Sequence, residues 1–168
     1  MQKISIVAAM SENQVIGAQN KLPWSLPFDW ENALRIVAGK PCIMGRKSYE
    51  SEDMIYSDLL NVVLSTKPIH HLPAGFIQAY HLDQAFEMLK KEPEIIVFGG
   101  SRVFAESWPR VNYLYLTIVH HHFKGDTFFP NIDWPSWKMV RSKRLEIDDR
   151  HAYPFSLNEY RRTSASPK

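Results

Sequence analysis

Short apolar runs alternate with helical segments along most of this chain. The apolar runs are residues 4–10, 42–44, 60–65, 75–79, 94–98 and 113–119. The segments with helical spacing are residues 26–38, 83–91 and 101–107. Continuous apolar runs of this length are typical of strands that are buried on both faces. Strands that alternate with helices predict an α/β fold with a mainly parallel central sheet and helices on both faces.

The C-terminal part of the chain breaks this alternation. Residues 136–145 and 153–161 look like two strands with no helix between them, so we expect an antiparallel edge there. A chain of 168 residues suits one domain. We expect this domain to span residues 1–162 and the tail at 163–168 to be frayed.

Local signals define the first helix and the segment before it. Ser25 can cap a helix that has Pro27 in its first turn. The sequence Gly-Lys-Pro at 39–41 would end that helix. The polar stretch at 11–20 is interpreted as a loop.

Charge and cysteine content exclude several classes of protein. The formal net charge of +2 is too weak for a nucleic-acid binder but suits an anionic small ligand. The single cysteine, Cys42, rules out an internal disulfide, and its apolar neighbours predict a buried thiol. No apolar run approaches the roughly 20 residues of a membrane span. We expect a cytoplasmic monomer with neither membrane nor nucleic-acid partners.

Three junctions that follow predicted strands favour anion binding. They are residues 44–48, 64–67 and 98–102. A helix N-terminus offers free N–H groups and a positive dipole end to a phosphate, and glycine lets the backbone come close. The basic residues Arg46, Lys47 and Arg102 favour the 2′-phosphate of NADP over NAD. Neither glycine-containing junction is G-x-G-x-x-G, and each alone fits an ordinary turn with a helix cap equally well.

Asp29 is the one acid within an aromatic and apolar stretch, residues 24–30. Burying a carboxylate there without a partner is costly, which is typical of a functional group. An acid in the first turn of a helix is also an ordinary feature, so both interpretations stay open from the residues alone. Consecutive residues on a strand point to opposite faces, so His120, His121 and His122 cannot converge on one metal ion. We expect no metal site.

Taken together, these motifs resemble the dihydrofolate reductase family. The matching motifs are residues 6–9, 15–17, 22–29, 39–41, 43–51, 61–65, 96–103, 114–117 and 125–130. Because they occur in order over nearly the whole chain, the resemblance is highly specific. It implies the family fold, NADPH as cofactor, and reduction of 7,8-dihydrofolate to tetrahydrofolate, with hydride passing to C6 and a proton to N5.

The resemblance also implies roles for individual residues. Asp29 would be the active-site acid that holds the pterin amino group and ring nitrogen, with Thr117 in the same hydrogen-bond network. Trp24 would help to order a water molecule, and the loop at 15–22 would close over the nicotinamide. The residues implied for substrate are Val7, Ala9, Asp29, Trp30, Ala33, Phe98 and Thr117. Those implied for NADPH are Ala9, Ile16, Gly17, Asn20, Lys21, Leu22, Gly45, Arg46, Lys47, Ser48, Leu64, Ser65, Thr66, Gly99, Gly100, Ser101, Arg102, Val103, Phe104 and Thr127.

The departures from the family pattern concern the folate tail. Leu59 stands where family members have an arginine that grips the α-carboxylate of the glutamate tail. A leucine has neither the charge nor the forked geometry for this contact. Residues 52–58 add acids nearby, and the usual Phe-Lys or Phe-Arg pair on the facing helix is Ala33-Leu34. Phe104 replaces a common tyrosine.

These departures leave two substrates open. The chain can be a dihydrofolate reductase with a weak or rearranged tail site, in which Arg35 substitutes for the missing arginine. It can instead reduce an unconjugated dihydropterin, such as a dihydrobiopterin- or dihydromonapterin-like compound. Two further alternatives are a nucleotide-binding protein that has lost catalysis and the reductase of riboflavin synthesis. Asp29, Trp24 and Thr117 together argue against the first alternative. The family of the second lacks the acid found here at Asp29.

Overall fold

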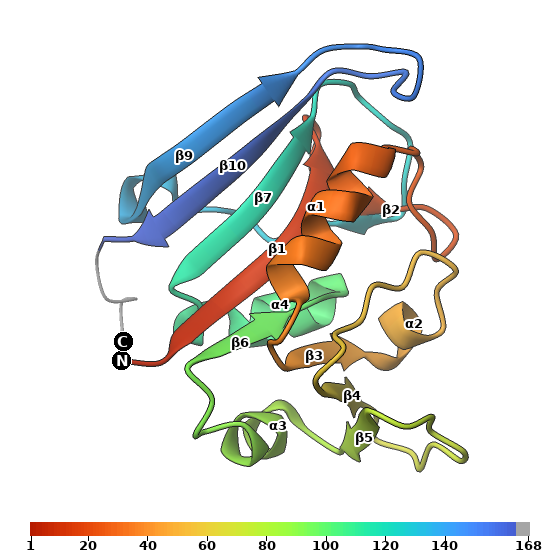
Figure 1. The fold of residues 1–168 in the computed structure, drawn as a ribbon, viewed down its shortest axis with the longest axis vertical. Helices are drawn as coiled ribbons and strands as arrows, with labels where there is room; N and C mark the ends of the chain where they lie inside the picture. Colours follow the sequence, from red (N-terminus) through yellow and green to blue (C-terminus); the bar gives the residue numbers. More distant parts are fainter. Residues whose placement is uncertain (164–168) are drawn as a thin grey trace.

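A twisted eight-stranded sheet runs through residues 1–163, the part of the chain that the computed structural model describes (Figure 1). From one edge to the other, its strands are β5 (Phe76–Ala79), β4 (Asn61–Leu64), β3 (Cys42–Gly45), β6 (Glu94–Val97), β1 (Lys3–Ser11), β7 (Tyr113–Val119), β10 (Phe155–Arg162) and β9 (Trp137–Leu145). The neighbours from β5 to β7 pair in parallel, whereas β10 pairs antiparallel with both β7 and β9. The predicted mainly parallel sheet with an antiparallel C-terminal edge is therefore confirmed.

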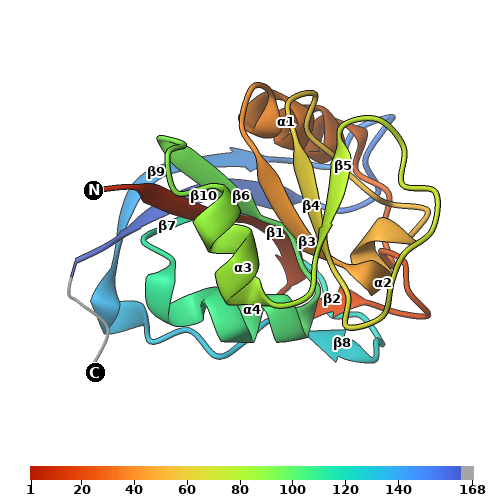
Figure 2. The ribbon, with the colours of Figure 1, turned by 90° about the horizontal axis from the view of Figure 1, so that it is seen from below.

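Helices cover both faces of the sheet, as predicted (Figure 2). Helix α1 (Pro27–Val37) buries Ala33 and Val37 against one face, together with Met44. Helices α3 (Leu82–Met88) and α4 (Ser101–Ser107) bury Phe86 and Phe104 against the other face. The short helix α2 (Arg46–Tyr49) follows β3 directly.

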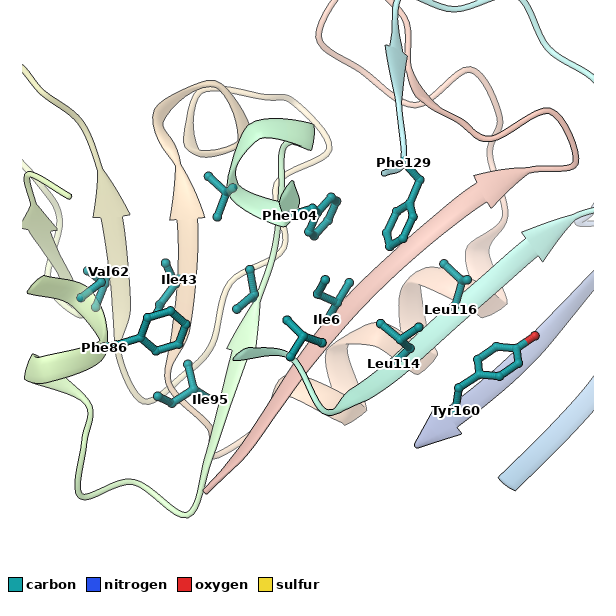
Figure 3. Close-up of a cluster of buried hydrophobic side chains, with 14 of the residues drawn as sticks. Ile6, Ile43, Val62, Phe86, Ile95, Phe104, Leu114, Leu116, Phe129 and Tyr160 are labelled. Carbon is teal, nitrogen blue, oxygen red and sulfur yellow. The ribbon is translucent and has the colours of Figure 1, made fainter. Parts of the chain in front are cut away.

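The larger core cluster lies between the sheet and helices α3 and α4 (Figure 3). Ile6 of the central strand β1 is fully buried and is the register partner of both Val97 and Leu114. Burial of each such aliphatic side chain stabilises the folded protein by about 1.5–3 kcal/mol. The three predicted functional junctions lie where β3, β4 and β6 of this packed sheet end.

Two local predictions were wrong. Residues 11–20 are not all loop, because β1 continues to Ser11 and β2 (Val15–Gly17) pairs with β8 (Thr127–Phe128) in a second sheet. The partner strand lies more than a hundred residues away, so no local pattern reveals the pairing. Helix α1 has Leu26, not Ser25, at its N-cap, although Pro27 is in the first turn as predicted.

The remaining described elements are two short 3₁₀ helices, η1 (Trp108–Arg110) and η2 (Trp134–Ser136). Residues 164–168 lie outside the described part, so the frayed tail at 163–168 and the domain limits at 1–162 stay predictions. Within residues 1–163, no helix has the length and apolar character that crossing a membrane requires.

Candidate active site

A cleft of about 250 Å³ opens between α1, the loop after β2 and the ends of strands β1, β3 and β6. It brings together residues that are far apart in the sequence. Those that were predicted as substrate residues and line it are Val7, Ala9, Asp29, Trp30, Ala33, Phe98 and Thr117. The whole predicted substrate set therefore shares one cavity.

The carboxyl group of Asp29 is the acidic centre of this cleft. Asp29 lies in the first turn of α1, and the Thr117 hydroxyl on β7 donates a hydrogen bond of 2.6 Å to its Oδ1. Burial raises the pKa of Asp29 from 3.8 to about 6, although the Thr117 hydrogen bond and the electrostatic effect of His151 oppose the shift. A carboxyl group with this pKa can hold or release a proton near neutral pH.

Apolar side chains form the walls around this carboxyl group. Val7 on β1 and Phe98 after β6 line the cleft on the sheet side, and Trp30 and Ala33 line it from α1. Together with Ile36 they leave few polar groups beside Asp29. A flat aromatic ring with one hydrogen-bonding edge suits such a site.

The loop after β2 forms another wall of the cleft, and two hydrogen bonds join it to the segment after α2. The Ser51 hydroxyl donates to the Asn20 carbonyl at 2.9 Å, and the Leu22 N–H donates to Asp53 Oδ2 at 2.6 Å. Sequence reasoning missed Ser51 and Asp53 as site residues because nothing local links them to a loop 31 residues earlier. The loop residues that line the cleft are Ile16, Gly17, Asn20, Lys21 and Leu22.

The cis-linked pair Gly99-Gly100 forms the far end of the cleft. Gly45 at the end of β3 donates its N–H to the Gly99 carbonyl at 2.8 Å, which joins two of the predicted junctions. A Cβ on Gly100 would meet no atom within 4 Å, so its backbone faces open space. The other predicted cofactor residues that line the cleft outside the loop are Ala9, Lys47, Ser48, Phe104 and Thr127.

Comparisons with known proteins agree with this arrangement. The family model for dihydrofolate reductase matches residues 3–162. The chain belongs to the dihydrofolate reductase family.

Individual members of the family match over nearly their whole length. A dihydrofolate reductase of Staphylococcus haemolyticus is 32% identical over 160 residues, which cover 95% of this chain and 96% of that protein. A type 3 dihydrofolate reductase of Salmonella typhimurium is 35% identical over 150 residues, covering 89% and 92%. The structure of dihydrofolate reductase from Enterococcus faecalis, complexed with NADP(H) and RAB-propyl, superposes with a TM-score of 0.86 at 29% identity, covering 96% and 97% of the two chains.

Some residues that the family resemblance assigns to NADPH do not line the cleft formed by residues 1–163. Two of them, Arg46 and Arg102, pair with Glu50 and Glu106 on their own helices, at 2.8 and 2.7 Å. The Ser65 hydroxyl donates to a carbonyl two residues later. The full set outside the lining is Gly45, Arg46, Leu64, Ser65, Thr66, Ser101, Arg102 and Val103. Their predicted contacts with the cofactor stay predictions.

Trp24 lies beside the cleft rather than in its lining. It borders a second hollow that shares Asp29 with the cleft, and its side chain is buried. Its Nε1 has no hydrogen-bond partner among residues 1–163. A buried donor of this kind needs an acceptor, which agrees with the predicted role in ordering a water molecule.

The residues that depart from the family pattern are divided between the cleft, which Ala33 and Phe104 line, and its surroundings. Leu59 is 49% exposed, and the cleft within residues 1–163 does not include it. Arg35 is exposed, with its guanidinium 5.9 Å from the centre of the Phe28 ring, and it does not line the described cleft either. The carboxylate of Asp53 does line the cleft, beside Met54.

Proposed function

We propose that this protein catalyses the NADPH-dependent reduction of 7,8-dihydrofolate to tetrahydrofolate, with Asp29 as the active-site acid. The observation that carries the proposal is the buried carboxyl group of Asp29, hydrogen-bonded to Thr117, beside the apolar side chains on the sheet and on α1. Membership of the dihydrofolate reductase family supports the same reaction.

Asp29 would both bind the pterin ring and supply a proton. Thr117 occupies Oδ1 of the carboxyl group, so Oδ2 and the second lone pair of Oδ1 can accept from the ring's amino group and adjacent N–H. Val7, Trp30 and Phe98 would hold the ring flat against the sheet. With a pKa of about 6, Asp29 carries a proton in a useful fraction of molecules, and a water ordered by Trp24 would pass it to N5.

NADPH is the cofactor of the proposed reaction, and when bound it supplies the hydride for C6. The open space at Gly100 fits a ligand that approaches the backbone closely, and Lys47 supplies a positive charge for a phosphate. Loop residues from Ile16 to Leu22 would cover the reacting rings and exclude water.

A second substrate class is an unconjugated dihydropterin. Two observations favour it: Leu59 is exposed and uncharged where the family has its tail-binding arginine, and the Asp53 carboxylate lies in the cleft wall. A carboxylate there repels an anionic glutamate tail but not a neutral substituent. Losing a charged, paired hydrogen bond costs about 1.5–3 kcal/mol, which lowers affinity roughly ten- to a hundredfold.

Steady-state kinetics separate these two substrates. We would measure NADPH oxidation and compare kcat/KM for 7,8-dihydrofolate and a tail-less dihydropterin. The Leu59→Arg variant should raise kcat/KM for dihydrofolate while leaving the tail-less substrate unchanged, and Leu59→Met serves as the control for side-chain bulk. Failure to reduce either substrate would refute the proposed function. A wild-type enzyme that strongly prefers dihydrofolate, with no gain from Leu59→Arg, would exclude the tail-less alternative.

A further inference from the structure

Helix α1 begins without a cap from its own sequence. Its N-cap residue, Leu26, makes no side-chain hydrogen bond with residues 1–163. Pro27 at the start of the helix has no N–H group, so the first backbone donor that needs a partner belongs to Phe28. This N–H donates to Nε2 of His151 at 3.0 Å.

His151 is held so that Nε2 is free to accept. The side chain is only 3% exposed and lies in the turn between β9 and β10. Its Nδ1 is 2.6 Å from Oδ1 of Asp148, a carboxylate that can only accept, so the ring proton lies on Nδ1. Backbone hydrogen bonds join Asp148 and His151 in both directions, and the ring packs 5.2 Å from that of Phe155.

We propose that His151 is a positioning residue for Asp29, because it caps the helix turn that carries this acid from 123 residues away. The cap fixes the peptide between Pro27 and Phe28, one residue before Asp29. Its effect on the reaction depends on the role of Asp29 proposed above, but its effect on the carboxyl group does not. An anchored first turn holds the carboxyl group against the Thr117 hydroxyl and away from bulk water.

Loss of the cap should change the environment of Asp29 in a defined direction. A frayed first turn admits water to the carboxyl group, and burial is the main cause of its raised pKa. Removing His151 also removes its electrostatic effect, which lowers the pKa of Asp29, but this is the smallest of the three causes and burial is the largest. The pKa of Asp29 should therefore fall from about 6 toward 3.8. The charged groups that face this corner are Asp29, Glu31 and Arg35 on α1, Asp53 across the adjoining hollow, Lys143 on β9, and Asp148 and Arg150 in the turn.

Two substitutions of His151 distinguish the effect of losing the hydrogen-bond acceptor from the effect of losing the volume of the ring. His151→Leu fills the space but offers no acceptor, whereas His151→Gln can present Oε1 to the Phe28 N–H. Arg150→Ala is the matched control, because it removes the 2.5 Å exposed ion pair with Glu31 between the same turn and helix but leaves the cap intact. Carboxyl-carbon NMR of the unliganded proteins measures the pKa of Asp29, and single-turnover kinetics measure hydride transfer.

His151→Leu should lower the pKa of Asp29 and slow hydride transfer roughly tenfold, with little change in the Kd of NADPH. His151→Gln should restore most of the pKa of Asp29 and of the rate of hydride transfer. Arg150→Ala should match the wild type in both. The inference is overturned by a His151→Leu variant that melts earlier but keeps the pKa of Asp29, or by a folded His151→Gln variant that restores nothing. A wild-type protein without reductase activity would refute the proposed function alone, since the NMR titration still tests the cap.

Discussion

Replacing Asp29 by asparagine should stabilise the protein while it removes the activity. The folded protein holds the Asp29 proton more tightly than the unfolded chain does, because burial raises the pKa from 3.8 to about 6. Wild-type stability should therefore fall as the pH rises from 3.8 to about 6, and this contribution should then stay constant. The pKa shift corresponds to a cost of about 3 kcal/mol at neutral pH.

Asparagine avoids this cost because it is neutral and its Oδ1 can still accept the Thr117 hydrogen bond. Loss of a negative charge from the first turn of α1 removes about 0.3–1 kcal/mol of favourable dipole interaction. The net gain should be about 2 kcal/mol at neutral pH, or roughly 4–8 °C in Tm. Hydride transfer should fall strongly, whereas NADPH should bind nearly as well as to the wild type.

Urea denaturation at several pH values measures this effect directly. The difference in unfolding free energy between Asp29→Asn and the wild type should grow across the window from pH 3.8 to about 6. Two results would refute the reasoning: a difference that does not change with pH, or a variant that is less stable than the wild type at neutral pH. Equal losses of hydride transfer and NADPH affinity would contradict the catalytic role instead.

Three further changes test other parts of the site. Thr117→Val removes the hydrogen bond that lowers the pKa of Asp29, so the midpoint of the pH profile of hydride transfer should rise, and an unchanged midpoint would contradict this. Gly125→Ala should lower the Tm and loosen the loop after β2, because a Cβ there would overlap the Val15 side chain; a melting curve like that of the wild type would argue against it. Asp53→Ala removes the acceptor for a loop N–H, so the NADPH dissociation rate should increase in stopped-flow experiments, while Asp53→Asn, which keeps an acceptor, should change it less.

The sequence by itself determined the layers of the fold and the identity of the acid. Hydrophobic periodicity is a local property, so the runs at 42–44 and 94–98 could be interpreted as strands without knowledge of their partners. The ordered motifs along nearly the whole chain were specific enough to indicate the family, although Asp29 alone fitted an ordinary helix start better.

Only the tertiary structure decided which distant groups meet around that acid. The pairing of β2 with β8, the contact between Asp53 and the loop, and the cap from His151 to α1 all join segments far apart in the chain. Each depends on one or a few hydrogen bonds rather than on a repeating pattern of apolar residues, so it leaves no periodic signal in the sequence. The sequence therefore identifies Asp29, and the folded chain supplies the burial, the hydroxyl and the helix cap that set its chemistry.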